Sequence, residues 1–169
     1  MEAALRVLNE MVADGVLLRY AIGGAMGALF YVEPVATYDL DVFVELPAEA
    51  SRSLAPLERV YSWLRSRSYA IDREHVLIDG TPVQILPAFN PLVEEAVQQA
   101  TSRLVGGVES SVCTAEYLVA ILVQTGRPKD RARLALFLDE ADLDSVGLQE
   151  ILARHGLVDR WNRLREEIG

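Results

Sequence analysis

The sequence predicts an α+β protein, with a mixed sheet flanked by helices over residues 1–113 and a C-terminal helical unit over residues 114–169 packed on it. Three observations predict this class. Short apolar runs bounded by turn residues alternate with amphipathic helical stretches in the first two thirds of the chain. Asp79-Gly80 lies between two such runs and is typical of a β-hairpin. From Thr114 onward, apolar residues recur at helical spacing alone.

Helices are expected where apolar residues recur three and four positions apart. The first covers residues 2–14, and a short helix over 25–32 is closed by Pro34. In the long helix expected over 47–67, Leu54 is among the residues predicted to face inward. The later helices are expected at 91–100, from 114, after 128, at 148–155 and at 157–168.

Strands are expected where apolar runs are short and are bounded by Gly, Pro, Asn or Asp. They are predicted at residues 16–22, 38–46, 74–78 and 81–86. The first of them ends in the tight turn Gly23-Gly24. The stretch 103–113 fits either an added edge strand or an irregular segment, so the number of strands is left open.

Composition narrows the possible partners and the compartment. Sixteen basic residues against 25 acidic ones give a net charge of −9, which disfavours broad binding to a nucleic-acid backbone but does not exclude a local basic groove. The single cysteine, Cys113, cannot form an internal disulfide, and the first residues lack the layout of a signal peptide. The longest apolar run, 20–32, is too short to cross a bilayer. We therefore expect a cytoplasmic protein with no membrane partner.

The segment 20–45 holds the residues with the clearest chemistry. Asp39 and Asp41 are two positions apart in the expected strand 38–46, and residues i and i+2 of a strand point to the same face. Two adjacent carboxylates repel each other unless a cation lies between them. The pair therefore predicts a site for a hard divalent metal, magnesium or manganese. Gly23 and Gly24 precede a short helix and allow the backbone to approach a phosphate closely.

These residues resemble a known group. Ile22-Gly23-Gly24-Ala25 followed by Thr37-Tyr38-Asp39-Leu40-Asp41-Val42 resembles the nucleotidyltransferase fold of the polymerase-beta-like superfamily. Glu116-Tyr117-Leu118-Val119-Ala120 followed by Gly126-Arg127-Pro128-Lys129-Asp130 is similar to a second block in nucleotidyltransferase-like proteins, including toxins of abortive-infection and toxin–antitoxin systems. The resemblance covers about two thirds of the chain.

The resemblance implies metal-dependent transfer of a nucleoside monophosphate from a nucleoside triphosphate to a hydroxyl acceptor. Asp39 and Asp41 would hold the metal, and one of them would serve as the base. The pair Gly23-Gly24 and the helix after it would cradle the triphosphate. Thr37 is expected to steady the turn before the Asp pair, and Lys129, the sole lysine of the chain, to contact phosphate. Small molecules, tRNA, protein hydroxyls and nucleotides are all compatible acceptors.

The chain also departs from that pattern in three places. Active relatives usually carry a third carboxylate on a later strand, where this chain has Gln84. Leu122 stands where relatives often have a lysine, and Arg133 where they often have an acidic residue. These departures predict a site with fewer catalytic groups. They support an alternative, a protein that keeps the fold and binds a nucleotide or a protein partner without turnover, such as one component of a toxin–antitoxin pair.

Simpler interpretations of the same residues stay open. Gly23-Gly24 alone also fits a tight turn without a ligand. The Asp pair also fits the polar face of an exposed strand. Lys129-Asp130 also fits the first turn of a helix, with Asp130 favoured there by the helix dipole. We assign no role to His75.

Overall fold

The computed structural model describes residues 1–33 and 37–168. Within this part of the chain the protein forms a seven-stranded mixed sheet and nine helices. The strands are β1 (Arg19–Ile22), β2 (Leu40–Glu45), β3 (Ala70–Asp72), β4 (His75–Ile78), β5 (Thr81–Pro87), β6 (Thr101–Val105) and β7 (Val108–Val112). The helices are α1 (Glu2–Ala13), α2 (Gly24–Ala28), α3 (Ala48–Ser51), α4 (Glu58–Ser66), α5 (Pro91–Gln98), α6 (Ala115–Thr125), α7 (Pro128–Glu140), α8 (Ser145–Arg154) and α9 (Val158–Ile168).

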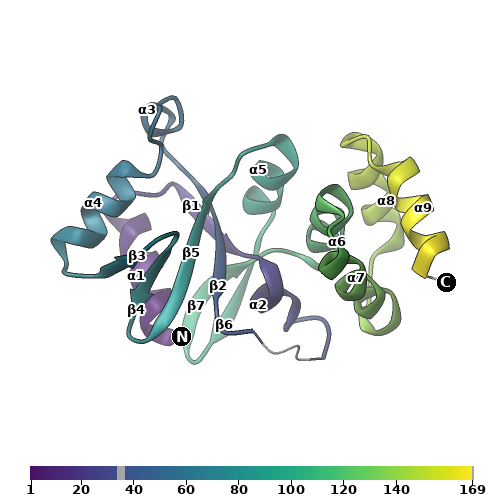
Figure 1. The fold of residues 1–169 in the computed structure, drawn as a ribbon, viewed down its shortest axis with the longest axis horizontal. Helices are drawn as coiled ribbons and strands as arrows, with labels where there is room; N and C mark the ends of the chain where they lie inside the picture. The colour runs from purple at the N-terminus through teal and green to yellow at the C-terminus, as the bar shows by residue number, and fades with distance from the viewer. Residues whose placement is uncertain (34–36, 169) are drawn as a thin grey trace.

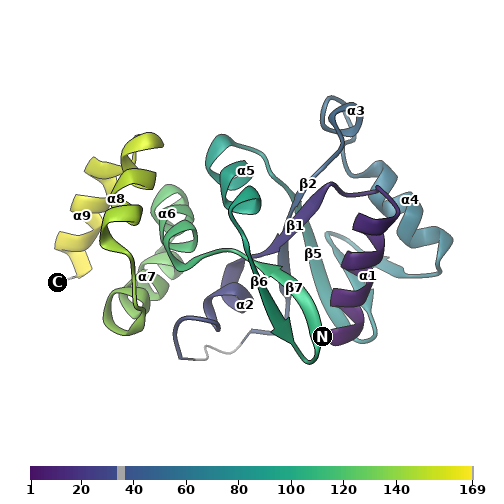
Figure 2. The ribbon, with the colours of Figure 1, turned by 180° about the vertical axis from the view of Figure 1, so that it is seen from behind.

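The strand order in the sheet is β3-β4-β5-β2-β1-β7-β6, so β2 lies at its centre. There β2 pairs antiparallel with β1 and parallel with β5. Helices α1 and α4 lie on one side of the sheet, and α2, α5 and α6 lie on the other (Figures 1 and 2). The remaining helices, α7 to α9, continue outward from α6, and the C-terminus lies at the far end of the molecule (Figure 1). Among the described residues, none of the helices combines the length and the hydropathy that a membrane span requires.

Alternation along β2 divides the core into two clusters. Val42 and Val44 pack with the side chains of α1 and α4, whereas Phe43 packs with those of α5 and α6. Successive strand residues point to opposite faces, so Asp41 shares the face of Phe43. The second cluster continues from α5 through α6 to α7, α8 and α9, where Trp161 is buried. The helical unit and the sheet thus share one core, and the division at residues 113/114 stays a prediction.

Several sequence-based expectations are corrected here. The strand predicted at 38–46 begins at Leu40, which leaves Asp39 just ahead of it. The helix predicted over 47–67 is two helices, α3 and α4, and Leu54 between them is fully exposed and does not face inward. Pro56 explains the interruption, because a proline disfavours helical backbone at the residue before it. The short strand β3 after α4 was not predicted.

The open stretch 103–113 is part of the hairpin β6–β7. Gly106 and Gly107 make its turn, with φ of +56° and +79°, values that favour glycine. The helix predicted over 25–32 is shorter, since α2 ends at Ala28. Its expected terminator, Pro34, lies outside the described residues.

Candidate functional site

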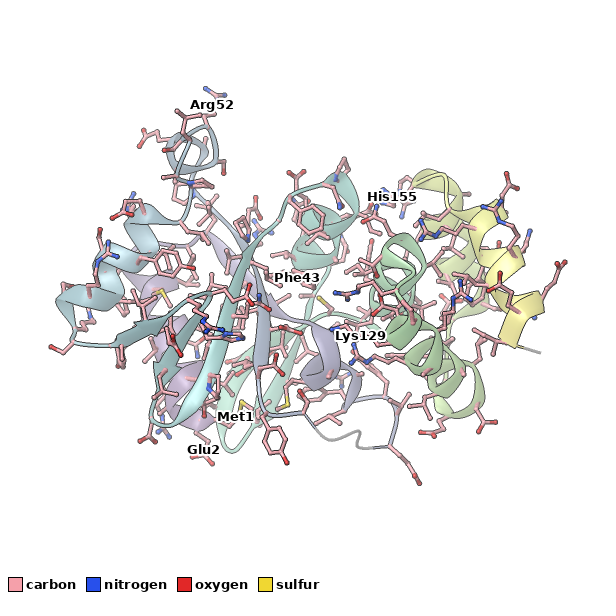
Figure 3. The ribbon with its side chains drawn as sticks, in the orientation of Figure 1. Met1, Glu2, Phe43, Arg52, Lys129 and His155 are labelled. Carbon is pink, nitrogen blue, oxygen red and sulfur yellow. The ribbon has the colours of Figure 1, made fainter. Side chains whose placement is uncertain are left out.

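A cavity of about 550 Å³ lies between the sheet face that carries Asp41 and the helices α6 and α7. The loop before β2, the end of β5 and the start of α2 complete its wall. In Figure 3, the labelled Phe43 and Lys129 come from the sheet side and the helical side of this cavity. The residues that line it are Gly24, Ala25, Thr37, Tyr38, Asp39, Asp41, Phe43, Gln84, Leu86, Phe89, Leu118, Ile121, Leu122, Thr125, Arg127, Lys129, Arg133 and Phe137.

Three polar residues form a row across the sheet, and the first two, Asp41 and Gln84, line the cavity. Asp41 of β2 pairs in register with Gln84 of β5, and Gln84 pairs with His75 of β4. Residues paired in this way point to the same face of a sheet. Gln84 is therefore the immediate neighbour of Asp41, at the position where the resemblance leads one to expect a third carboxylate. His75, to which the sequence assigned no role, is the next residue of the row.

Asp39 reaches the cavity from the segment before β2 and not from the strand itself. Its Oδ1 accepts a hydrogen bond of 3.0 Å from the hydroxyl of Thr37. Burial raises the pKa of Asp41, and the negative charge of Asp39 raises it further. The two carboxylates therefore influence each other electrostatically, although only Asp41 lies on the strand itself. Thr37 thus contacts the carboxylate of Asp39, and its role in steadying the turn stays a prediction.

The two glycines have different functions in the structure. Gly24 has φ of +56°, and a Cβ at this position would overlap Oδ2 of Asp41. The N–H of Gly23 donates to the carbonyl oxygen of Asp41 at 2.9 Å, and a Cβ at Gly23 would overlap the ring of Phe43. Of the pair, Gly24 lines the cavity, while Gly23 is not among the described lining residues. The glycine pair therefore shapes a tight turn, and it also brings the start of α2 against a carboxylate.

Three cationic residues of α7 and its N-terminus, Arg127, Lys129 and Arg133, line the cavity opposite the Asp pair. Arg133 and Lys129 both favour the charged form of Asp41 and so oppose the rise of its pKa. Arg131 differs, because it forms a half-exposed ion pair of 2.8 Å with Glu167. Arg131 therefore lies on the solvent side of α7, whereas Arg127 and Arg133 belong to the cavity.

Asp130 stabilises the start of α7 and is only 1% exposed. Its Oδ2 accepts bonds from the hydroxyl of Thr125 at 2.7 Å and from the backbone N–H of Arg127 at 3.1 Å. The guanidinium of Arg127 also pairs with this carboxylate at 2.8 Å. Burial alone raises the pKa of Asp130, but these hydrogen bonds outweigh it and lower the pKa. The helix-start interpretation is therefore right for Asp130.

The rim of the cavity holds two aromatic side chains that the sequence did not single out. Tyr38 is 87% exposed and Phe89 is 67% exposed. Phe89 also lines a second cavity, of about 660 Å³, near the ends of β2 and β5. Its place between Pro87 and Asn90, just beyond a strand, was the available signal, since exposed aromatic residues in such loops often contact ligands. Leu122 lies in the wall of the cavity and makes it apolar at the position where the relatives often have a lysine.

The donor set suits one divalent ion. Across the described residues no group of three or more His, Cys, Asp and Glu side chains is arranged to hold a metal. Asp39 and Asp41 offer carboxylate oxygens, and the side chain of Asp41 receives no hydrogen bond from the described residues of the protein. Magnesium and manganese are bound through one or two carboxylates together with substrate phosphates and water, so two carboxylates at an open cavity meet the requirement.

Comparisons with known proteins bear on the fold. No protein-family model matches the sequence, and no curated protein matches it. An antigenic nucleotidyltransferase-like protein from Paracoccidioides brasiliensis has a similar structure, with a TM-score of 0.58 and 14% identity over 99% of this chain and 91% of that one. The antibiotic-resistance factor ANT(2'')-Ia is also similar, with a TM-score of 0.51 and 14% identity over 99% and 98%. The chain therefore has a nucleotidyltransferase-like fold.

Proposed function

We propose that the protein is a metal-dependent nucleotidyltransferase, which moves a nucleoside monophosphate from a nucleoside triphosphate to a hydroxyl acceptor. One observation carries the proposal: the acidic pair Asp39 and Asp41 faces the cations Lys129 and Arg133 across a single cavity. A triphosphate with its divalent ion needs both kinds of partner, carboxylates for the ion and cations for the phosphates. The nucleotidyltransferase-like fold supports the same reaction class at a general level.

Each residue receives a role from its place in the cavity. Asp39 and Asp41 would hold magnesium or manganese, which when bound neutralises phosphate charge and orients the reacting oxygens. Thr37 holds the carboxylate of Asp39 in place through its hydroxyl. At the first turn of α2, Gly24 and Ala25 have backbone N–H groups without intrahelical acceptors, which can donate to a phosphate. Lys129 offers a mobile ammonium to the same triphosphate.

In the transfer step, the acceptor oxygen attacks the α-phosphorus of the nucleotide. The bond from the α-phosphorus to the oxygen that bridges to the β-phosphate breaks, and pyrophosphate leaves with that electron pair. The acceptor proton passes to a carboxylate of the Asp pair. Asp39 and Asp41 are the candidates for this role, because the described residues that line the cavity include no third acidic side chain. The remaining catalysis comes from positioning and from fixed positive charge.

The acceptor is the least constrained part of the proposal. Tyr38 and Phe89 offer aromatic surface at the rim, and Phe89 borders the second cavity. We propose an acceptor that extends past Phe89 out of the catalytic cavity. A cytoplasmic location accords with the single buried thiol of Cys113, whose pKa burial raises to about 12.

A second candidate is a binding protein without turnover. Gln84 occupies the position next to Asp41, and Leu122 makes the facing wall apolar. Both observations favour a site that retains a nucleotide, or that a protein partner covers, as in a toxin–antitoxin pair. Such a protein would bind nucleotide with its ion but would release no pyrophosphate with any acceptor.

Calorimetric titration tests the proposal. Each nucleoside triphosphate is titrated with and without magnesium into the wild type and into Asp41→Asn. We expect magnesium-dependent binding by the wild type and its loss in the variant. Binding that is independent of magnesium, or that persists in Asp41→Asn, would contradict the role of the Asp pair. Release of pyrophosphate in an acceptor screen then separates the enzyme from the binding protein.

A further inference from the structure

Arg133 lies where the resemblance leads one to expect an acidic group, yet it faces the acidic pair. It is on α7, one helical turn after Lys129, and residues four apart share a helix face. Both line the cavity that contains Asp41. The face is set by Leu134 and Phe137, which are buried and anchor α7 against the rest of the core. Arg133 is thus held over the site by the packing of its own helix.

The charge of Arg133 is available to a ligand, in contrast to the charges of Arg127 and Arg131. Arg127 is paired with Asp130, and Arg131 is paired with Glu167. Within residues 1–33 and 37–168, no carboxylate forms an ion pair with Arg133. Of the cations that act on Asp41, Arg133 has the largest effect. A phosphate between Asp41 and α7 would therefore meet an unpaired guanidinium.

The neutral side chain of Gln84 bears on the role of the Arg133 guanidinium, because the described part of the site lacks a third carboxylate to hold a second metal ion. In two-metal phosphoryl-transfer sites, the two ions together stabilise the attacking and leaving oxygens, and the second ion adds positive charge to the site. A second divalent ion together with one further carboxylate that holds it adds one net positive charge. Arg133 in the same cavity as the neutral Gln84 adds the same single positive charge. Arg133 on α7 therefore supplies the positive charge that a second metal ion would bring if a carboxylate stood in place of Gln84.

We propose that Arg133 binds the phosphates of the nucleotide and takes the place of a second metal ion, so that the site works with one divalent ion held by Asp39 and Asp41. This inference rests on the proposed function. The guanidinium presents its N–H donors as a planar fork that matches two phosphate oxygens, whereas the ammonium of Lys129 acts as a point charge. In the sequence, Arg133 was interpreted as the loss of an acidic residue from the site. In this proposal, it adds a group that binds phosphate.

The test compares Arg133→Gln with Arg131→Gln. Both variants remove one positive charge from α7, and Gln is a good helix former, so α7 should persist. Calorimetry measures magnesium-dependent binding of the four ribonucleoside triphosphates and of inorganic tripolyphosphate, after thermal unfolding has shown that both variants are folded. A lost charge-assisted contact weakens binding by about tenfold to a hundredfold, so we expect this for Arg133→Gln with both kinds of ligand. We expect a change within about twofold for Arg131→Gln, whose ion pair is exposed.

Counting bound Mn²⁺ by electron paramagnetic resonance supplies a second readout. With saturating triphosphate, we expect one protein-held Mn²⁺ per wild-type chain. Two ions per chain would overturn the proposal, and so would equal nucleotide affinity in Arg133→Gln and the wild type. An effect of Arg133→Gln on nucleotides but not on tripolyphosphate would also overturn it, because the contact would then not be to phosphate. A wild type that binds no nucleotide would overturn both this inference and the proposed function. The preceding outcomes differ, because in them the wild type binds nucleotide and only the role of Arg133 fails.

Discussion

Gly24 and Asp41 occupy adjoining space so closely that a Cβ on the glycine would overlap Oδ2 of the carboxylate. The start of α2 therefore lies directly against the carboxylate of Asp41. Gly24 also has φ of +56°, a backbone conformation that other L-residues adopt at a cost. The relationship explains why α2 begins with a glycine, and it leads to the first prediction.

Substitution of Gly24 by alanine is expected to abolish magnesium-dependent nucleotide binding, because the new methyl group displaces the carboxylate of Asp41. Gly80→Ala is the matched control, since Gly80 has φ of +76° but no atoms within 4 Å of the place that a methyl group would take. Both variants should lose about 1–2 kcal/mol of unfolding free energy through backbone strain. Calorimetry and urea unfolding separate the two effects. Equal nucleotide affinity in the two variants would show that the close approach has no role in binding.

The stability of the metal-free protein should depend on pH through Asp41. Its folded-state pKa is raised above the ordinary 3.8 by burial and by Asp39, so the folded state holds a proton that the unfolded chain releases. This contribution is favourable at low pH and is lost as the pH rises from 3.8 through the raised pKa. Asp41→Asn has no carboxylate to ionise, so it should be more stable than the wild type at neutral pH. The difference in unfolding free energy between the two proteins should shrink as the pH falls toward 3.8. Urea unfolding across this range without metal measures it, and a constant difference would contradict the assignment.

Asp130→Asn should destabilise the protein by about 1–3 kcal/mol at neutral pH, because it weakens the buried hydrogen bonds from Thr125 and Arg127. Because the pKa of Asp130 is lowered in the folded state, its carboxylate stabilises the fold fully above pH 3.8, the ordinary pKa. This stabilisation is lost as the pH falls through the folded-state pKa. The wild type should therefore lose stability in acid more steeply than the variant. Urea unfolding between about pH 2 and pH 6 follows both curves. Parallel curves would mean that the carboxylate charge of Asp130 is not what stabilises the start of α7.

A polar cluster joins α5 to the helical unit and predicts a coupled change. Glu95 accepts a hydrogen bond of 2.8 Å from Tyr117, forms an ion pair of 2.7 Å with Arg154 and contacts His155 at 2.5 Å. His155, labelled in Figure 3, lies near α5. Burial and then Glu95 raise the pKa of Tyr117 to about 12.

Glu95→Gln should lower the pKa of Tyr117 and reduce the free energy of unfolding by about 1–2 kcal/mol. Glu94→Gln changes the same charge at the exposed neighbouring position and should alter neither quantity appreciably. Ultraviolet titration of tyrosinate and urea unfolding provide the two measurements. An unchanged high-pH tyrosine titration in Glu95→Gln would show that burial alone governs Tyr117.

Much of the sheet could be predicted from local pattern. The strands at β1, β2, β4 and β5 follow from short apolar runs, and the hairpin at Asp79-Gly80 follows from its turn residues. The break between α3 and α4 was missed because helical periodicity continues across it, although Pro56 marked the position. Leu54 was placed inside for the same reason. Local patterns report spacing, but they do not report whether a neighbouring surface exists to cover the residue.

The sequence by itself determined only the local parts of the candidate site: an acidic pair in a predicted buried strand, a glycine turn before a short helix, and a lone lysine at a helix start. Only the tertiary structure decided how these parts meet. The pairing of Asp41 with Gln84, the close approach of Gly24 and the entry of Arg133 into the cavity all join residues far apart in the chain. Such relationships depend on strand order and on how Leu134 and Phe137 orient α7. Both are set by the packing of the whole core, which no local pattern of residues specifies.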